Sequence, residues 1–281
     1  MLDFRQLVPD EAGIAAAFLS RFPEETVEMT GRFEKYGLRN TKLHKREGDW
    51  FGAFSDGQLT GLFTFSNHRS FLCHYTDSEI LKKVVLLKSL RQYAPKNLSG
   101  TERCMAPIYD LISKTLRDVR YAECWQMFAA PAPAVEPPVG VYAFTDARQC
   151  DLNRAMEFLI EAEKAFGRKP RMNSDLKTRI MAREEQEVYL FLMSGGMPVA
   201  QGMIEYQTGR YGQISAVYTA KAQRNKGFGT GIMLELMGRI RGSGRQPALI
   251  VEKRNSGALK LYEDLGFVKG PASVVINVEM E

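Results

Sequence analysis

The sequence predicts an α/β protein made of two similar units that follow one another along the chain, each with a mixed central sheet flanked by helices. The chain has 281 residues, which is enough for two cores of ordinary size. Its apolar and charged fractions, 44% and 25%, are typical of a globular protein. Stretches with strand and helix periodicity recur in the same order in both halves, and this recurrence indicates an internal duplication.

The two halves meet at a run rich in alanine and proline, residues 129–139. Such a run cannot sustain a helix or a central strand, so we expect an extended linker. It separates a domain predicted at residues 1–128 from a second domain predicted at residues 140–281.

In the first half, alternating apolar residues predict strands and apolar residues at helical spacing predict helices. The expected strands are residues 4–7, 50–54, 59–65, 71–75, a short one near Leu98, and 121–128. The expected helices are residues 11–21, 24–36, 79–93 and 106–117. Ser55-Asp56-Gly57 predicts a hairpin turn, and Trp50 with the Phe-rich hairpin is expected in the core.

The second half repeats this order. The expected strands are residues 141–144, 188–193, 199–206 and 214–218, with a turn at Ser194-Gly195-Gly196. The expected helices are residues 151–166 and 174–183, followed by one whose apolar positions are Ile232, Met233, Leu236, Met237 and Ile240.

Between the strand at 214–218 and that last helix lies a basic loop with two glycines, Gly227 and Gly229. The first turn of a helix has N–H groups without intrahelical partners and a partial positive charge, so a diphosphate can bind there. Arg224 and Lys226 add positive charge. The loop fits neither the P-loop pattern nor the dinucleotide pattern G-x-G-x-x-G, and its R-x-x-G-x-G alone is also compatible with a solvated basic turn.

A second motif lies downstream. Residues 255–267 read as a helix with Asn255 as N-cap and Gly266 just beyond its C-terminus. Asn255 and Tyr262 are about two turns apart and project to nearly the same side, with Ala258 close to that side. An amide and a phenol therefore line one groove.

Together the two motifs resemble those of the GNAT superfamily of acyl-CoA-dependent N-acyltransferases, R/Q-x-x-G-x-G/A and N-x-x-A-x-x-x-Y-x-x-x-G-F. The resemblance implies two tandem GNAT-like domains, with strands of the C-terminal copy splayed at the CoA site. It implies acetyl-CoA, or another acyl-CoA, as co-substrate.

The resemblance also assigns roles to residues. The main chain of Val217, Tyr218 and Thr219 is expected to hold the pantetheine arm, and one of these N–H groups can polarise the thioester carbonyl. The pyrophosphate is assigned to the main chain of Arg224, Asn225, Lys226, Gly227, Phe228, Gly229 and Thr230. Asn255 is expected at the pantetheine arm, and Tyr262 is expected to protonate the departing thiolate. The simpler interpretation of Tyr262 is an aromatic side chain packed on the sheet.

A general base is harder to assign. Some GNAT branches carry a glutamate on the strand before the phosphate loop, where this chain has Gln213. Glu205, on the preceding expected strand, is the nearest acidic candidate and a weak one. A base that acts through water, or an amine that arrives neutral, satisfies the chemistry equally well.

The first copy differs at the corresponding place. There the chain passes from His74 through Asp77 to Glu79 without any glycine. Acidic side chains at that helix start occupy the anion position and repel a diphosphate. We therefore expect one CoA site per chain, and we expect the first copy to cover the sheet, shape the acceptor pocket or mediate association.

The remaining composition excludes several classes of protein. The four widely spaced cysteines suggest neither a zinc site nor a disulfide framework, and His44, His68 and His74 have no metal-ligand spacing, so no metal is expected. A net charge of +5 is too small to argue for nucleic acid, and no stretch is apolar enough to cross a membrane. With no basic leader followed by an apolar segment, the chain is expected to be cytoplasmic.

We therefore predict an N-acyltransferase that acts on a primary amine, with a small molecule as the preferred acceptor. Two alternatives remain open at this point: a non-catalytic CoA-binding or interaction module, and an enzyme that modifies a protein or an RNA-linked amine. The sequence leaves the oligomeric state open between monomer and homodimer.

Overall fold

The computed structural model describes residues 2–131, 142–167, 173–181 and 188–279. The chain divides into two compact units. The first comprises residues 1–127 with 250–259 and 269–281, and the second comprises 128–249 with 260–268. Most of the predicted linker, residues 132–139, lies outside the described residues, so the division at 129–139 stays a prediction.

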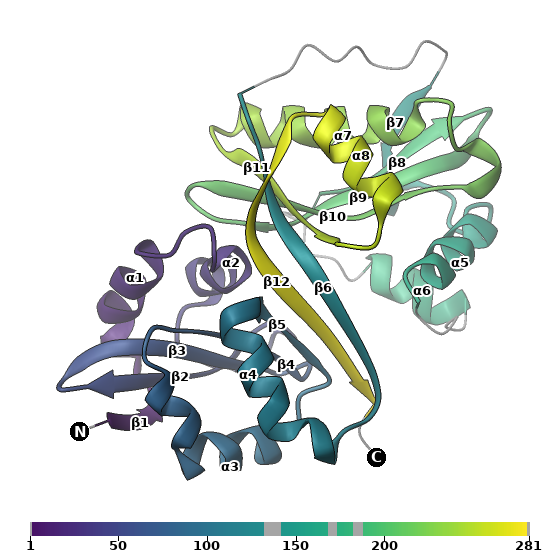
Figure 1. The fold of residues 1–281 in the computed structure, drawn as a ribbon. Coiled ribbons are helices and arrows are strands. Elements are labelled where there is room, and N and C mark those ends of the chain that lie inside the picture. The colour runs from purple at the N-terminus through teal and green to yellow at the C-terminus, as the bar shows by residue number, and fades with distance from the viewer. Residues whose placement is uncertain (1, 132–141, 168–172, 182–187, 280–281) are drawn as a thin grey trace. The chain divides into compact units, whose positions relative to one another are not determined.

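The elements follow the same order in both halves of the chain (Figure 1). The first half contains β1 (Leu2–Gln6), α1 (Ala12–Ser20), α2 (Val27–Tyr36), β2 (Gly48–Ser55), β3 (Gln58–Ser66), β4 (Ser70–Tyr75), α3 (Val84–Tyr93), β5 (Asn97–Thr101), α4 (Glu102–Ile112) and β6 (Arg117–Ala129). The second half contains β7 (Ala143–Asp146), α5 (Met156–Ala165), α6 (Asn173–Met181), β8 (Val188–Ser194), β9 (Met197–Gln207), β10 (Tyr211–Thr219), α7 (Phe228–Gly242), β11 (Gln246–Glu252), α8 (Ser256–Asp264) and β12 (Phe267–Glu279). This order confirms the predicted duplication.

Each unit has a mixed sheet, as predicted. In the first unit the strand order is β1-β2-β3-β4-β5-β12-β6, and in the second it is β11-β10-β9-β8-β7. The pairs β4–β5 and β10–β11 are parallel, whereas the neighbouring hairpins are antiparallel. Both predicted hairpin turns are present, and Asp56, Gly57, Gly195 and Gly196 have the positive φ that such turns require.

The last strand of the chain belongs to the first unit. β12 pairs antiparallel with β5, in a register that runs from Ser273↔Thr101 to Asn277↔Asn97. Val274, Ile276 and Val278 are buried in the same cluster as α3 and α4 side chains. The C-terminal copy thus supplies a strand to the sheet formed by the N-terminal copy.

The first unit is a three-layer structure. Leu62 and Leu72 point to a core shared with α1 and α2, whereas Phe63, Phe71 and Cys73 point to the core under α3 and α4. Successive residues of a strand face opposite sides of the sheet, which explains this division. Trp50 is buried, as predicted.

In the second unit, α5 and α6 pack on one face of the sheet. Leu152, Ala155, Leu159 and Ala162 are buried there, as their spacing predicts. The five apolar positions predicted for α7 are all buried as well. Gly202 of β9 allows α7 to pack closely, because a Cβ at that position would lie 2.7 Å from Leu236 Cδ1.

Three helix predictions were wrong in their bounds. The predicted helix at 79–93 is a 3₁₀ turn, Ser78–Lys82, followed by α3, with an extended backbone at Lys83. Ile80 and Leu86 are both fully buried in one cluster, and a continuous α-helix would turn them about 120° apart. The break allows both to face the core.

The helix predicted at 106–117 starts earlier, at Glu102, and contains Pro107. The helix predicted at 151–166 begins only at Met156. Cys73, Cys104 and Cys124 are buried free thiols, and Cys150 is half-buried. Among the described residues, no helix combines the length and apolar character needed to span a bilayer.

Candidate active site

The strand that leads into the glycine loop is bent by a bulge. β10 pairs with β9 at Ser215↔Met203 and again at Tyr218↔Gln201, so β10 carries one extra residue between these pairs. Ala216 lies in this interval with a φ of 53°. A bulge of this kind bends its strand and interrupts the ladder of hydrogen bonds.

On its other side, β10 is paired in parallel with β11 from Tyr211↔Gln246 to Ile214↔Leu249. Within the described residues, this register ends before the bulge, so the C-terminal half of β10 departs from β11. This departure agrees with the predicted splay of strands in the C-terminal copy. Val217 and Thr219 are half-buried on this segment, and Tyr218 is buried between them.

The loop after β10 reverses direction through two left-handed residues, Asn225 with a φ of 60° and Gly227 with a φ of 82°. Gly227 is the N-cap of α7 and has no side chain with which to cap it. The first backbone bond of the helix runs from the Gly231 N–H to the Gly227 carbonyl, at 2.9 Å. The first turn also contains no acidic residue, so no carboxylate of that turn competes with an external anion for its N–H groups and its positive dipole end.

The two predicted cations border this helix start and are exposed. Arg224 Nε donates to the Thr219 carbonyl at 3.3 Å, and its guanidinium lies 5.9 Å from the centre of the Tyr218 ring. Lys226 Nζ donates to Gln223 Oε1 at 2.9 Å. Exposed bonds of this kind are weak, so both cations can turn toward a bound anion.

The first turn of α7 is closely packed. A Cβ at Gly229 would lie 3.3 Å from Thr219 Oγ1 and 3.5 Å from Leu261 Cδ2, so the main chain of this turn lies against β10 and α8. Phe228 and Thr230 flank Gly229 in the same turn and are half-buried.

The acidic residues predicted at the corresponding helix start of the first unit lie elsewhere. Asp77 Oδ1 accepts a hydrogen bond from the Glu79 N–H at 3.0 Å and caps the 3₁₀ turn Ser78–Lys82. Helix α3 begins only at Val84, after Lys83, and has no acidic residue in its first turn, so the prediction that acidic side chains occupy this helix start was wrong.

Helix α8 has the ends predicted for it. Asn255 Oδ1 accepts from the Ala258 N–H at 3.2 Å, which makes Asn255 a helix cap, and its amide N–H₂ remains able to donate to a ligand. Gly266 follows the helix with a φ of 81°, the left-handed conformation of a C-terminal glycine.

Tyr262 is 8% exposed, and its ring centre lies 5.9 Å from that of Phe267. Burial raises the pKa of Tyr262 to about 12. The phenol therefore stays protonated at neutral pH and is a hydrogen-bond donor.

Gln213, which stands where the resemblance leads one to expect a base, is a buried amide. Gln213 is 5% exposed, and its Oε1 has no hydrogen-bond partner among the described residues. Glu205 is half-buried. On β9, Tyr206 pairs with Gln213 and Ile204 pairs with the next residue of β10, Ile214, so Glu205 is the extra residue of a bulge on β9. Neither observation identifies a base.

Sequence reasoning missed Glu161, a half-buried residue of α5. Its Oε1 accepts from the Lys221 N–H at 3.1 Å, which fixes the beginning of the loop. Burial opposes its charge, but the nearby Tyr218 phenol and the hydrogen bond from the Lys221 N–H hold the pKa of Glu161 below its ordinary value. No local signal marks it, because the contact spans sixty residues of chain.

In the part of the chain that the structure describes, no group of three or more His, Cys, Asp and Glu side chains is placed to hold a metal ion.

Residues 198–275, which include the bulge, the loop and α8, match the family described as FR47-like protein. No curated protein matches the sequence at a significant level.

Solved structures match the chain over nearly its whole length. A GCN5-related N-acetyltransferase from Sphaerobacter thermophilus is 19% identical, with a TM-score of 0.63 over 99% of this chain and 95% of that one. A GNAT-family acetyltransferase from Colwellia psychrerythraea is 14% identical, with a TM-score of 0.55 over 99% and 100%. A tandem GNAT protein from the clavulanic acid biosynthesis pathway is 12% identical, with a TM-score of 0.54 over 99% and 98%. At these identities the similarity is one of fold.

Proposed function

We propose that this chain is an N-acetyltransferase of the GNAT superfamily that moves an acetyl or other short acyl group from acyl-CoA to a primary amine of a small molecule. The observation that carries the proposal is the start of α7. It is a helix N-terminus opened by Gly227, free of acidic residues in its first turn, and reached from a bulged strand.

Positioning supplies most of the acceleration in this proposal. The N–H groups from Arg224 to Thr230 hold the diphosphate, with Arg224 and Lys226 adding charge. The main chain of Val217 to Thr219 holds the pantetheine arm, and Asn255 donates to the same arm. A thioester carbonyl and an amine fixed at attack distance react as an intramolecular pair, which can replace about 7–11 kcal/mol of the barrier.

In the reaction, the amine nitrogen forms a bond to the thioester carbon and the carbon–sulfur bond breaks, which gives an amide and a free thiol. A main-chain N–H of residues 217–219 polarises the carbonyl. Tyr262 donates to the departing sulfur. A pKa of about 12 is well above that of an ordinary thiol, about 8.5, so Tyr262 acts mainly as a hydrogen-bond donor that stabilises the developing thiolate.

The amine must lose a proton, and Gln213 cannot take it. Gln213 Oε1 can accept a hydrogen bond from the amine N–H and orient its lone pair toward the carbonyl. The proton then leaves through water or through Glu205, which is the weaker candidate.

One observation favours a second candidate function. The absence of a carboxylate at Gln213 is compatible with a protein that binds acyl-CoA without transferring the acyl group. Both functions require the anion site at α7, and only the first requires turnover.

The test is a turnover screen. Wild-type protein is incubated with acetyl-CoA and a panel of primary amines that includes a polyamine, an aminosugar and an amino-acid amide. Thiol release and the mass of the amine are measured together. We expect thiol release coupled to a gain of one acetyl group on at least one amine. Binding of acetyl-CoA with no acetylated amine across the panel would support the non-catalytic function instead.

A further inference from the structure

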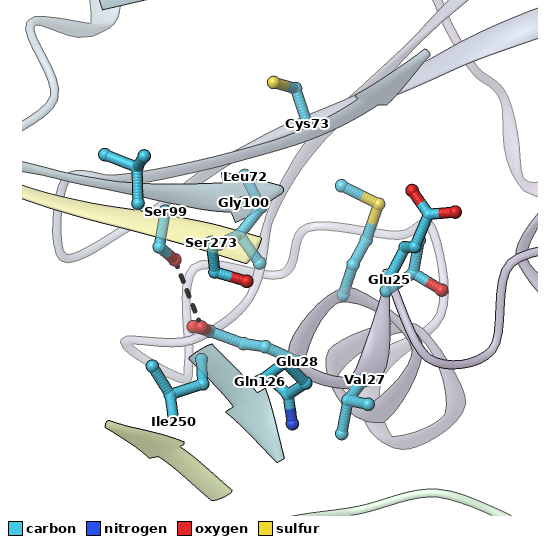
Figure 2. A pocket seen from close by; sticks show the side chains of 13 residues that line it. Glu25, Val27, Glu28, Leu72, Cys73, Ser99, Gly100, Gln126, Ile250 and Ser273 are labelled. Carbon is cyan, nitrogen blue, oxygen red and sulfur yellow. Dashed lines mark hydrogen bonds between the residues drawn. The ribbon is translucent and has the colours of Figure 1, made fainter. Parts of the chain in front are cut away.

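The first unit contains a pocket that the proposed transfer reaction does not use. It is partly open and is lined by residues of α2 and the segment before it, together with residues of β4, β5, β6 and β12 (Figure 2). Ile250, in the part of β11 that belongs to the first unit, completes the lining. None of the residues assigned above to acyl-CoA or to catalysis lines it.

One part of the lining is apolar. Val27 and Met29 come from α2, Leu72 from β4 and Val274 from β12, and all four are buried. A wall of this kind favours a ligand with a branched or straight hydrocarbon tail.

The pocket also presents two fixed carboxylates. Glu28 Oε1 accepts from Arg32 at 2.6 Å and its Oε2 accepts from Ser99 at 3.2 Å, the bond drawn in Figure 2. Glu25 Oε2 accepts from Arg103 Nε at 3.2 Å and Nη2 at 3.0 Å. Each carboxylate is paired with one arginine, but neither arginine lines the pocket, so a ligand meets the carboxylate side of each pair. A carboxylate can accept several hydrogen bonds at once, so an ammonium can share one with an arginine.

An independent observation comes from Gln126, which also lines the pocket. The side chain is 4% exposed, and its Nε2 has no hydrogen-bond partner among the described residues. A buried amide that lacks a partner is destabilising, and such groups in native proteins are usually satisfied by a ligand or water. As a donor of two hydrogens, Nε2 requires an acceptor such as a carbonyl oxygen.

From these features we propose that the pocket of the first unit binds a small organic ammonium that carries a neighbouring carbonyl group and an apolar tail. The ammonium pairs with Glu25 and Glu28. The carbonyl accepts from Gln126 Nε2, and the tail packs on Val27, Met29, Leu72 and Val274.

The test uses three probes in calorimetric titrations of the full chain without acetyl-CoA. L-leucinamide has all three features, and 4-methylpentanamide lacks the ammonium. L-leucine has a carboxylate in place of the amide, which brings a further negative charge beside Glu25 and Glu28. We expect saturable one-to-one binding of L-leucinamide. The other two probes should bind at least about tenfold more weakly, the loss expected for one charge-assisted hydrogen bond or one like-charge contact.

Variants locate the binding. E25Q and Q126M should each weaken the binding of L-leucinamide by about tenfold or more. Q126M should not lower the melting temperature, because the Nε2 group that it removes has no hydrogen-bond partner among the described residues. E79Q is the matched control, because it makes the same chemical change as E25Q at an exposed carboxylate of the first unit. Glu79 pairs with Lys82 and lies outside the pocket, so E79Q should bind L-leucinamide with the wild-type affinity. G227E should also bind as wild type does, which separates this pocket from the acyl-CoA site.

Three results would overturn the proposal. They are no saturable binding of L-leucinamide to wild type, equal affinity for 4-methylpentanamide, and binding unchanged in both E25Q and Q126M. Circular dichroism and melting curves of each variant show whether it is folded before its affinity is compared.

Discussion

Replacing Gly227 with glutamate tests the anion site at α7 most sharply. The new carboxylate lies at the N-cap of α7, at the positive end of the helix. A single negative charge about 6 Å from a diphosphate with two negative charges, at an effective dielectric constant of about 40, opposes binding by about 3 kcal/mol. The dissociation constant for acetyl-CoA should therefore rise by about a hundredfold.

Two control variants separate charge from strain. Gly227 has a φ of 82°, where an L-residue costs about 1–2 kcal/mol, so G227A should lower the unfolding free energy by that amount while weakening acetyl-CoA far less than G227E does. G238E adds the same charge to the same helix at an exposed glycine with open space around it. That site lies about 16 Å further along the axis, beyond a Debye length of about 8 Å, so affinity should change by less than about twofold.

The assay is calorimetric titration at a temperature at which all three variants are folded. An affinity of G227E equal to that of wild type would refute the assignment of the diphosphate to α7. An equal loss in G227A and G227E would show that backbone strain, not charge, controls binding.

Three further predictions follow from particular side chains. Y262F should keep its affinity for acetyl-CoA within about twofold and lose about a hundredfold in kcat, whereas unchanged turnover would remove Tyr262 from the reaction. Because the pKa of Tyr262 is about 12, deprotonation of the phenol should not lower wild-type kcat below about pH 10. Burial and then Arg103 lower the pKa of His74 to about 3, so only the unfolded state gains this proton as pH falls below about 6.5. The unfolding free energy of the wild type should therefore decrease by up to about 1.4 kcal/mol per pH unit, and H74Q should flatten this pH dependence between about pH 6 and 5. Denaturant titrations that give the same pH dependence of the unfolding free energy for both proteins would contradict this prediction. G202A should lower the unfolding free energy by about 1–3 kcal/mol because its Cβ meets Leu236, whereas G238A, which has open space around it, should raise it by about 0.5–1 kcal/mol. An unchanged unfolding free energy in G202A would show that α7 can shift away from β9.

The features predicted well from the sequence are those set by local chemistry. Asn255 caps α8 and Gly266 follows it in the left-handed conformation, because capping depends on a few neighbouring residues. The turn glycines and the buried stripe of α7 are predictable for the same reason. The start of α7 at Gly227 also follows from a short motif.

Features that depend on distant residues were not predictable in this way. No local pattern indicates that β12 pairs with β5 in the first unit, since strand pairing is decided by the whole sheet. The contact between Glu161 and the Lys221 N–H has the same origin. The break at Lys83 arises because Ile80 and Leu86 must both reach one core, a demand that overrides helix propensity.

The pocket of the first unit shows the same limit at a binding site. Glu25 and Glu28 belong to one short segment of sequence, but Gln126 and Val274 come from strands that are far from it along the chain. A list of candidate residues made by motif therefore finds the α7 site and misses this pocket.

The central claim is that a duplicated fold holds one acyl-CoA site per chain, at the start of α7. The most direct test is calorimetric titration of the wild-type protein with acetyl-CoA, with the stoichiometry as the readout. We predict saturable binding of one acetyl-CoA per chain. A stoichiometry of two, or no binding at millimolar acetyl-CoA, would contradict the claim.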